Sequence, residues 1–135
     1  MKKKLSLLSR ILGIENKPVS HTERLISAAG GFIAILTTLA ICQFFLGLHN
    51  AAVLVASMGA SAVLLFAVPH GPLSQPWSVF GGHVSSAVIG VSCALWINND
   101  LYAAATAVGL ATGAMYYLRC IHPPGGATAL SAVLG

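Results

Sequence analysis

The sequence predicts an all-α membrane protein with four transmembrane helices plus a re-entrant or truncated fifth helix. Of its 135 residues, 56% are hydrophobic and only 7% are charged, whereas soluble domains carry about a quarter charged residues. A chain this short cannot bury so much apolar side chain, because small domains are mostly surface. The apolar side chains must therefore face lipid.

Four uncharged segments have the length that a membrane span needs. Each has about 18–23 residues, and a helix needs about 20 to cross a hydrocarbon core of roughly 30 Å. Helices are expected because an open sheet edge in lipid would leave backbone groups unpaired. The segments cover approximately residues 25–47, 51–68, 79–97 and 101–118.

Polar connections separate these segments. Pro69 ends the second segment, because proline disrupts a continuing helix, and a polar loop follows over residues 70–76. Residues 98–100, Asn-Asn-Asp, form a predicted turn. The apolar stretch after Gly126 has only nine residues. It is either a re-entrant half-helix or the start of a fifth span that the chain end at Gly135 cuts short.

The basic residues predict the orientation. Six of the seven lysines and arginines lie in the first 24 positions, so the N-terminus is expected in the cytoplasm. We expect a basic cytoplasmic tail over residues 1–23 and a transmembrane domain over residues 24–135. The protein would be a multi-pass protein of the cell inner (plasma) membrane, with no nucleic-acid partner. Residues 5–14 are either a short interfacial helix or a disordered basic tail.

A short motif occurs twice. The sequence Gly-Ala-Ser-Ala at positions 59–62 resembles Gly-Ala-Thr-Ala at positions 126–129, which lies 67 residues later. In the predicted topology the two copies run in opposite directions, as in the inverted repeats of many transporters. The alternative is chance, since small residues recur often in membrane helices.

Three features could carry chemistry. The run His-Pro-Pro-Gly-Gly at positions 122–126 predicts a helix break followed by a new helix, whose first amides and dipole could bind an anion; the alternative is a plain break. Small and hydroxyl residues at positions 57–61 either line a pathway or only pack helices closely. His83 is a rare ionisable group within or near a span, or else an interfacial histidine. The candidate anion-binding residues are Ser57, Gly59, Ala60, Ser61, His83, His122, Gly125, Gly126, Ala127 and Thr128.

Several residue types are missing from the predicted spans. The three acids are Glu15, Glu23 and Asp100, all outside the uncharged segments. The three cysteines show no CxxC spacing, and no HxxxH pair is present. No nucleophile stands beside a base. We therefore expect no enzyme activity, no metal and no cofactor, and the remaining neutral or positive groups suit an anion better than a cation.

Several blocks of the sequence resemble the HPP family of membrane proteins. His122-Pro-Pro-Gly-Gly-Ala-Thr-Ala is similar to the family signature, and residues 57–66, 69–76 and 81–83 are similar to further blocks. The likeness covers about residues 24–135. Where the family pattern often has serine and arginine, this chain has Gly71 and Trp77. The resemblance implies a small multi-span protein, and some cyanobacterial and plastid members are associated with nitrite transport.

The sequence therefore favours a transporter or channel for a small inorganic anion, with nitrite as the first candidate. The anion would bind at helix N-termini near Gly59 and Gly126. A homodimer is expected, because one chain has few helices to enclose a path and C2 symmetry is the commonest. The alternative is a non-transporting membrane anchor or sensor module that acts through a partner protein.

Overall fold

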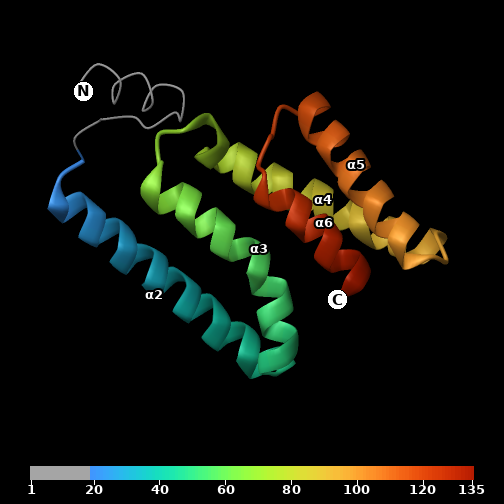
Figure 1. Cartoon of the computed structure of the whole chain (residues 1–135), viewed down its shortest axis with the longest axis horizontal. Coiled ribbons are helices and arrows are strands. Elements are labelled where there is room, and N and C mark those ends of the chain that lie inside the picture. The colour runs from blue at the N-terminus through green and yellow to red at the C-terminus, as the bar shows by residue number, and fades with distance from the viewer. Residues whose placement is uncertain (1–18) are drawn as a thin grey trace, which may run out of the picture.

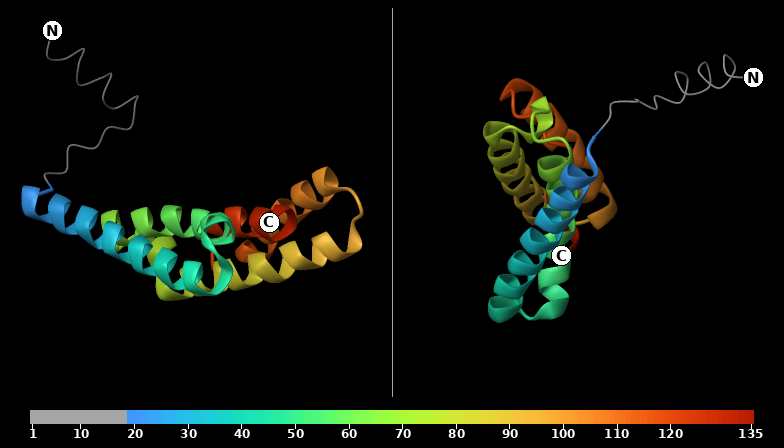
Figure 2. Two further views of the ribbon diagram at one scale, coloured as in Figure 1. Left: turned by 90° about the horizontal axis from the view of Figure 1, so that it is seen from below. Right: turned by 90° about the vertical axis from the view of Figure 1, so that its left-hand side faces the viewer.

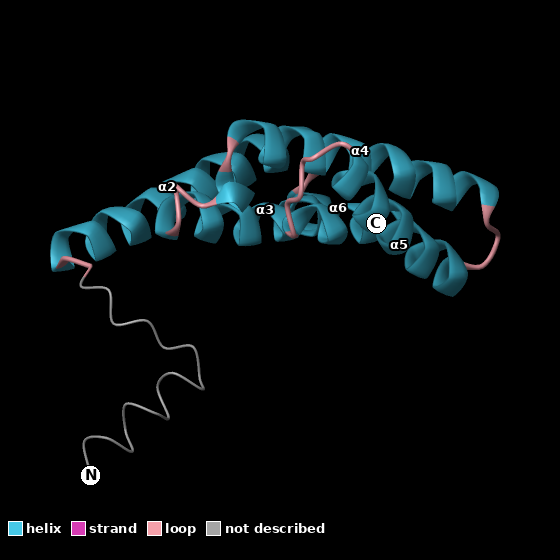
Figure 3. Ribbon diagram, turned by 90° about the horizontal axis from the view of Figure 1, so that it is seen from above, coloured by secondary structure: helices cyan, strands magenta, loops and turns pink. Residues whose placement is uncertain are grey.

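The computed structural model describes residues 19–135, except for the side chains of Leu46 and residues 48–54, and this part of the chain folds into helices joined by short loops (Figure 3). The predicted interfacial segment over residues 5–14 lies outside the described residues. The helices are α2 (His21–Leu46), α3 (Leu48–Ala67), the short 3-10 helix η1 (Pro72–Ser74), α4 (Pro76–Trp96), α5 (Asp100–Tyr117) and α6 (Pro124–Leu134).

The long helices run alternately in opposite directions (Figure 1). α2 packs on α3 and α4 packs on α5, so the chain forms two hairpins that are displaced along the long axis of the molecule (Figures 1 and 2). α6 packs on α4, α5 and α3 and joins the two hairpins. α3 and α6 run antiparallel to each other (Figure 1). The inner part of the bundle is therefore built from α3, α4, α5 and α6.

Most helices begin a few residues before the apolar segments that predicted them. α2 begins at His21 because Ser20 and Glu23 form a capping box: the Glu23 amide donates to Ser20 Oγ at 3.1 Å and the Ser20 amide donates to the Glu23 carboxylate at 2.9 Å. The end of the predicted tail is thus already helical. α4 begins at Pro76, where the missing amide proton costs nothing. His83 then lies about 10 Å along the helix rather than at its edge.

Two described helices, not four, are long and apolar enough to cross a membrane: His21–Phe45 and Pro76–Trp96. The prediction of four spans is corrected in this respect. The fully described part of α3, Val55–Ala67, is too short to be tested as a span. α5 has 18 residues but includes Asp100 and three tyrosines, which lower its apolar character. α6 has 11 residues and is shorter than a span, as its sequence suggested.

Small residues bring the inner helices close together. Ala103, Ala107 and Ala111 of α5, each four residues apart, are completely buried. On α4, Gly90 lies against α6, where a Cβ atom would lie only 2.6 Å from the carbonyl oxygen of Ala129. Such contacts between small residues are how helices associate in a membrane, where the hydrophobic effect between helices is weak.

Large apolar side chains point away from the bundle. No residue in the apolar window of α2 is buried, and Phe32 and Phe44 are 68% and 84% exposed. Trp96 and Tyr117, on the other hairpin, are also largely exposed. A surface with this composition is stable against lipid, and it confirms the prediction that the apolar side chains face outward.

Candidate functional site

The link between α5 and α6 folds back into the bundle. α5 ends in a Schellman motif: the Cys120 amide donates to the Met115 carbonyl at 3.0 Å and the Arg119 amide donates to the Tyr116 carbonyl at 3.2 Å. Arg119 adopts the left-handed conformation that this motif needs, with φ of 54°. The sharp turn directs Cys120 inward, where it has no exposed surface.

The glycine pair before His83 makes room for this link. A Cβ atom on Gly81 would lie 2.9 Å from Cys120 Cβ, and one on Gly82 would lie 2.6 Å from His122 Cβ. Both distances are too short for real side chains, so α4 accepts the link only because these two positions lack one. His122 is thereby pressed against α4 and is completely buried.

Four side chains, from α3, α4, the link before α6 and α6 itself, form a connected group, which we call the histidine network: Ser61, His83, His122 and Thr128. Ser61 Oγ lies 2.9 Å from His83 Nε2 and 2.9 Å from His122 Nε2. Thr128 Oγ1 lies 2.7 Å from His83 Nδ1. The two imidazole rings are 4.9 Å apart between centroids, with 66° between their planes. α3, α4 and the start of α6 therefore meet at this group.

The Leu73 carbonyl oxygen, which accepts from His122, sets the direction of every hydrogen bond in the network. His122 Nδ1 lies 2.8 Å from the Leu73 carbonyl oxygen, which can only accept, so Nδ1 carries the proton. In a neutral imidazole, His122 Nε2 must then accept a hydrogen bond, and Ser61 donates its single proton to it. His83 Nε2 must donate to Ser61 Oγ, and His83 Nδ1 must accept from Thr128. With both rings neutral, one arrangement satisfies all four ring nitrogens, and in it each group donates in the same direction. The longer contacts from Ser61 Oγ to the Ser57 carbonyl, 3.3 Å, and from Thr128 Oγ1 to the Pro124 carbonyl, 3.4 Å, then carry no proton.

A cavity of about 430 Å³ reaches this network at Thr128. It lies among α2, α3, α4 and α6, and its wall is mainly apolar with a few hydroxyl groups. Ser57, one of these, is 2% exposed. A wall of this kind can hold a small ligand and orient it by hydroxyl hydrogen bonds. The residues that line the cavity are Thr38, Cys42, Val55, Ser57, Met58, Ala87, Val91, Thr128, Ser131 and Ala132.

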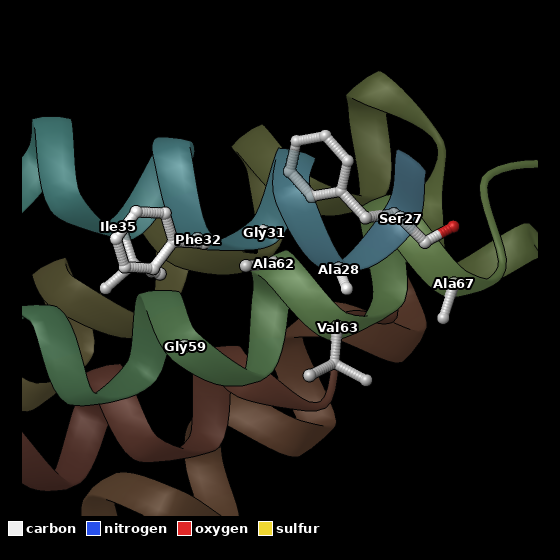
Figure 4. Close-up of a pocket in the computed structure, with 10 residues that line it drawn as sticks. Ser27, Ala28, Gly31, Phe32, Ile35, Gly59, Ala62, Val63 and Ala67 are labelled. Carbon is white, nitrogen blue, oxygen red and sulfur yellow. The ribbon is translucent and has the colours of Figure 1, made fainter. Parts of the chain in front are cut away.

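A second cavity, of about 330 Å³, lies between α2 and α3 (Figure 4). Phe32, Ile35 and Val63 line it together with small residues, and Ser27 is its single hydroxyl group. No member of the histidine network reaches it. This apolar groove is suited to a lipid chain, so the candidate site is the cavity at Thr128.

The predicted amide site is not present. Gly59 lies inside the continuous helix α3 and not at a helix N-terminus. The Gly125 amide donates to the His122 carbonyl at 2.8 Å, and the Gly126 amide donates to the Pro123 carbonyl at 3.0 Å. The tight turn before α6 therefore already uses the amide protons that the sequence suggested would be free for an anion.

The other candidate residues divide into two groups. Ser57, Ser61, His83, His122 and Thr128 lie on the cavity wall or in the histidine network. The backbone of α3 and α6 turns two further candidates outward: Ala60 and Ala127 are exposed on the surface of their helices.

Sequence reasoning missed the Leu73 carbonyl, the partner that orients His122, because a backbone oxygen has no sequence signal. It also missed Thr38 and Ser131 on the cavity wall. Their place within apolar segments was a weak indication that they line the bundle interior, since hydroxyl groups there bond either their own backbone or groups inside the bundle. Among the described side chains of residues 19–135, which exclude Leu46 and residues 48–54, no three histidine, cysteine or acidic groups gather as metal ligands would.

Fold and site together define a helical integral membrane protein with a buried polar network beside a cavity. The chain belongs to the HPP family, since the family model for the HPP transmembrane region matches residues 16–135. No solved structure matches the chain.

Two proteins of Dictyostelium discoideum, both described as transmembrane proteins, are similar to the chain. One is 46% identical over 87 residues and the other is 42% identical over 108 residues. These matches cover 62% and 76% of this chain but only 30% and 34% of the relatives. The chain thus spans about a third of the length of the relatives it matches, and their names assign no substrate.

Proposed function

We propose that this chain is a transmembrane transporter or channel for a small inorganic anion, with nitrite as the first candidate. The observation that carries the proposal is the cavity of about 430 Å³ whose hydroxyl wall reaches the histidine network. Buried ionisable groups are costly inside a membrane, and where they occur they mark substrate or ion pathways. A module that only anchors a partner would need neither the cavity nor the network.

The chemistry of the site favours an anion. The cavity wall carries hydroxyl groups, one thiol and no carboxylate, and the imidazoles beside it are neutral or positive. A cation would find no negative partner there, and a buried ion without a partner is unstable. Nitrite is small enough for the cavity and accepts hydrogen bonds at both oxygens. The association of some members of the family with nitrite transport supports this choice.

We also propose a homodimer in the inner membrane with the N-terminus in the cytoplasm. α2 packs mainly on α3 and leaves most of its surface uncovered, so a second copy has room beside it. Light scattering on the detergent-solubilised protein measures the mass of the assembly. A monomeric mass under conditions that keep transport would remove the dimer from the proposal.

Flux into proteoliposomes tests the function directly. We expect vesicles that contain the protein to take up nitrite faster than protein-free vesicles, and a panel of nitrite, nitrate, chloride and formate ranks the anions. The N-terminal deletion of residues 2–17 should keep this flux if the transmembrane domain is the working part. Equal uptake of all four anions with and without protein would refute transport and favour the anchor or sensor alternative.

A further inference from the structure

The cavity has no fixed positive charge to balance an anion. Lys and Arg residues are absent from α3, η1, α4 and α6. Arg24 of α2 is exposed and lies 14 residues before Thr38, the first residue of the cavity wall. His70 and Arg119, in the loops beside the network, are also exposed. Cys42 is the only titratable side chain on the described cavity wall, and a thiol is neutral or negative. Hydroxyl groups alone do not offset the cost of taking a charge out of water.

The countercharge must therefore come from the histidine network itself. Imidazole is the side chain that gains a proton most readily near neutral pH, and Thr128 joins the cavity wall to His83 Nδ1 at 2.7 Å. In the neutral arrangement this nitrogen carries no proton and accepts a hydrogen bond from the Thr128 hydroxyl. It is therefore the place where an added proton would enter.

We infer that the histidine network takes up one proton for each anion that enters the cavity, so that the protein moves a monovalent anion together with a proton. This inference rests on the proposed function. It adds the driving force of transport, which the proposed function leaves open.

A hydronium ion is the only reactant that the proton transfer requires. A hydronium ion in the cavity gives a proton to Thr128 Oγ1 while the proton of Thr128 moves to His83 Nδ1. The products are water, an unchanged threonine hydroxyl and a His83 imidazolium. The positive charge now lies one residue away from the anion in the cavity.

The network can also move this charge inward. His83 Nε2 passes its proton to Ser61 Oγ while Ser61 passes its own proton to His122 Nε2, over two contacts of 2.9 Å each. His83 is left neutral with its proton on Nδ1, and His122 becomes the imidazolium, held by the Leu73 carbonyl at 2.8 Å. The transfer needs every donor in the chain to point the same way, and the Leu73 carbonyl ensures this.

The short distance between the His83 and His122 rings limits the network to one added proton. The groups that face His83 are His122, Ser61 and Thr128, and none of them is an acid. With the ring centroids 4.9 Å apart, two imidazoliums would repel each other strongly, because like charges at this distance disfavour double ionisation. One proton for the pair, and so one proton for each monovalent anion, is the expected ratio.

Wild-type protein in proteoliposomes tests the inference through two separate driving forces. Nitrite is the probe, and uptake into protein-free vesicles, which measures nitrous acid crossing the lipid, is subtracted. In one arm the outside is more acidic and the membrane potential is held at zero with valinomycin and equal potassium. In the other arm the pH is equal and the potential is positive inside. We expect uptake in the first arm alone, and a gradient of about one pH unit should sustain about a tenfold anion gradient.

His83→Gln supplies the matched variant, because glutamine keeps hydrogen-bonding groups but cannot take up a proton near neutral pH. We expect it to lose uptake driven by the pH gradient, whereas Ser85→Ala, which removes a hydroxyl bonded to its own helix at 2.7 Å, should keep it. Uptake driven by the potential and indifferent to pH would overturn the proton coupling and leave anion transport standing. Failure of both arms would overturn both proposals. If His83→Gln does not assemble, the two wild-type arms decide the question.

Discussion

Ser61 and Thr128 bind opposite nitrogens of one imidazole ring, that of His83. Ser61 Oγ lies 2.9 Å from Nε2 and Thr128 Oγ1 lies 2.7 Å from Nδ1. The two residues occupy equivalent positions in the short motif that recurs after 67 residues. The alanine that follows each of them, Ala62 or Ala129, is also buried.

This equivalence is the relationship that an inverted repeat would produce. α3 and α6 carry the two copies and run antiparallel (Figure 1), and α4 presents His83 between them. Each copy thus contributes one hydroxyl group to the same ring. The orientation of the copies in a membrane remains a prediction, which the labelling experiment below tests.

Three serines in the inner helices should respond differently to replacement by alanine. Ser61→Ala leaves two imidazole nitrogens without a partner, and each unsatisfied buried group costs about 1–3 kcal/mol. Ser86 Oγ is fully buried without a hydrogen-bond partner among the described residues, so Ser86→Ala should be neutral or stabilising. Ser85→Ala should change stability little, because this hydroxyl bonds only the carbonyls of its own helix.

Thermal unfolding of the three variants in the same detergent measures this order. A Ser61→Ala variant as stable as Ser86→Ala would show that the hydroxyl of Ser61 does not join the two imidazoles. Flux through the same preparations should fall for Ser61→Ala and stay near the wild-type value for Ser85→Ala.

Two neighbouring glycines should differ in their tolerance of a side chain. A Cβ atom on Gly125 would lie 2.9 Å from the Gly82 carbonyl oxygen and 2.9 Å from Ser86 Oγ, whereas one on Gly126 would meet nothing within 4 Å. Gly125→Ala should therefore cost about 1–3 kcal/mol through overpacking between α4 and α6. Gly126→Ala should be neutral or slightly stabilising, because alanine favours a helix more than glycine does.

The two variants are compared by unfolding temperature and by the yield of assembled protein. If Gly126→Ala is the damaging change and Gly125→Ala is tolerated, α6 does not pack on α4 as described. Gly126→Ala also tests whether the Gly126 amide binds the anion. Because this amide already donates to the Pro123 carbonyl, a methyl group at this position should leave anion flux unchanged.

The sequence predicted the course of the helices well because apolar length and charge are local properties. It placed the start of α4 at residue 79, and the structure begins this helix at Pro76. The reason is that apolarity marks the part of a helix that faces lipid, whereas capping residues and N-terminal prolines lie outside that part. The Ser20 and Glu23 capping box lies before the apolar segment, so the apolar length did not locate it.

The sequence selected the residues of the candidate site from three separate features and did not predict their contacts. It selected His83 as a rare ionisable group near a span, Ser61 as a hydroxyl residue within a span, and His122 and Thr128 from the Pro-Pro-Gly-Gly run. It assigned the anion to free amides at Gly126, which was wrong, because only the geometry of the turn shows that His122 and Pro123 accept those protons. Partners that are backbone atoms depend on the fold as a whole.

Single cysteines in two loops should report opposite sides of the membrane. In a background without native cysteines, His70→Cys and Asn98→Cys both place the thiol at an exposed position. Ser74 would be a poor choice, since it is only 5% exposed and donates to the Leu64 carbonyl at 3.0 Å. We expect a membrane-impermeant maleimide to label Asn98→Cys from outside and His70→Cys only after the membrane is opened. Labelling of both from one side would contradict the predicted topology and the inverted repeat.

Charge selectivity should depend on His83 and not on surface histidines. Other anions should compete with nitrite for uptake, whereas potassium or ammonium at constant anion concentration should not. His83→Ala removes the imidazole that Ser61 and Thr128 hold, so the affinity for nitrite should fall about tenfold or more, equivalent to about 1.4 kcal/mol. His70→Ala is the control, because His70 is exposed in the loop after α3. Equal effects of the two substitutions would show that the site lies elsewhere.

The last prediction tests whether the anion passes through the cavity, by a change that leaves the histidine network intact. Ala87 of α4 lines the cavity at Thr128, whereas Ala94, seven residues further along the same helix, is exposed and lines none of the cavity. Ala87→Leu places three more carbon atoms in the cavity and leaves all four network side chains in place. Ala94→Leu adds the same atoms on the outer surface.

We expect Ala87→Leu to lower nitrite flux at least about tenfold, which corresponds to about 1.4 kcal/mol of additional barrier, and Ala94→Leu to leave it nearly unchanged. Both variants should unfold near the wild-type temperature, because filling a cavity with apolar atoms removes little packing. Initial rates of uptake into proteoliposomes, normalised to the protein inserted, make the comparison. If Ala87→Leu transports at the wild-type rate, nitrite does not pass through this cavity, and a path would have to run along another surface of the bundle.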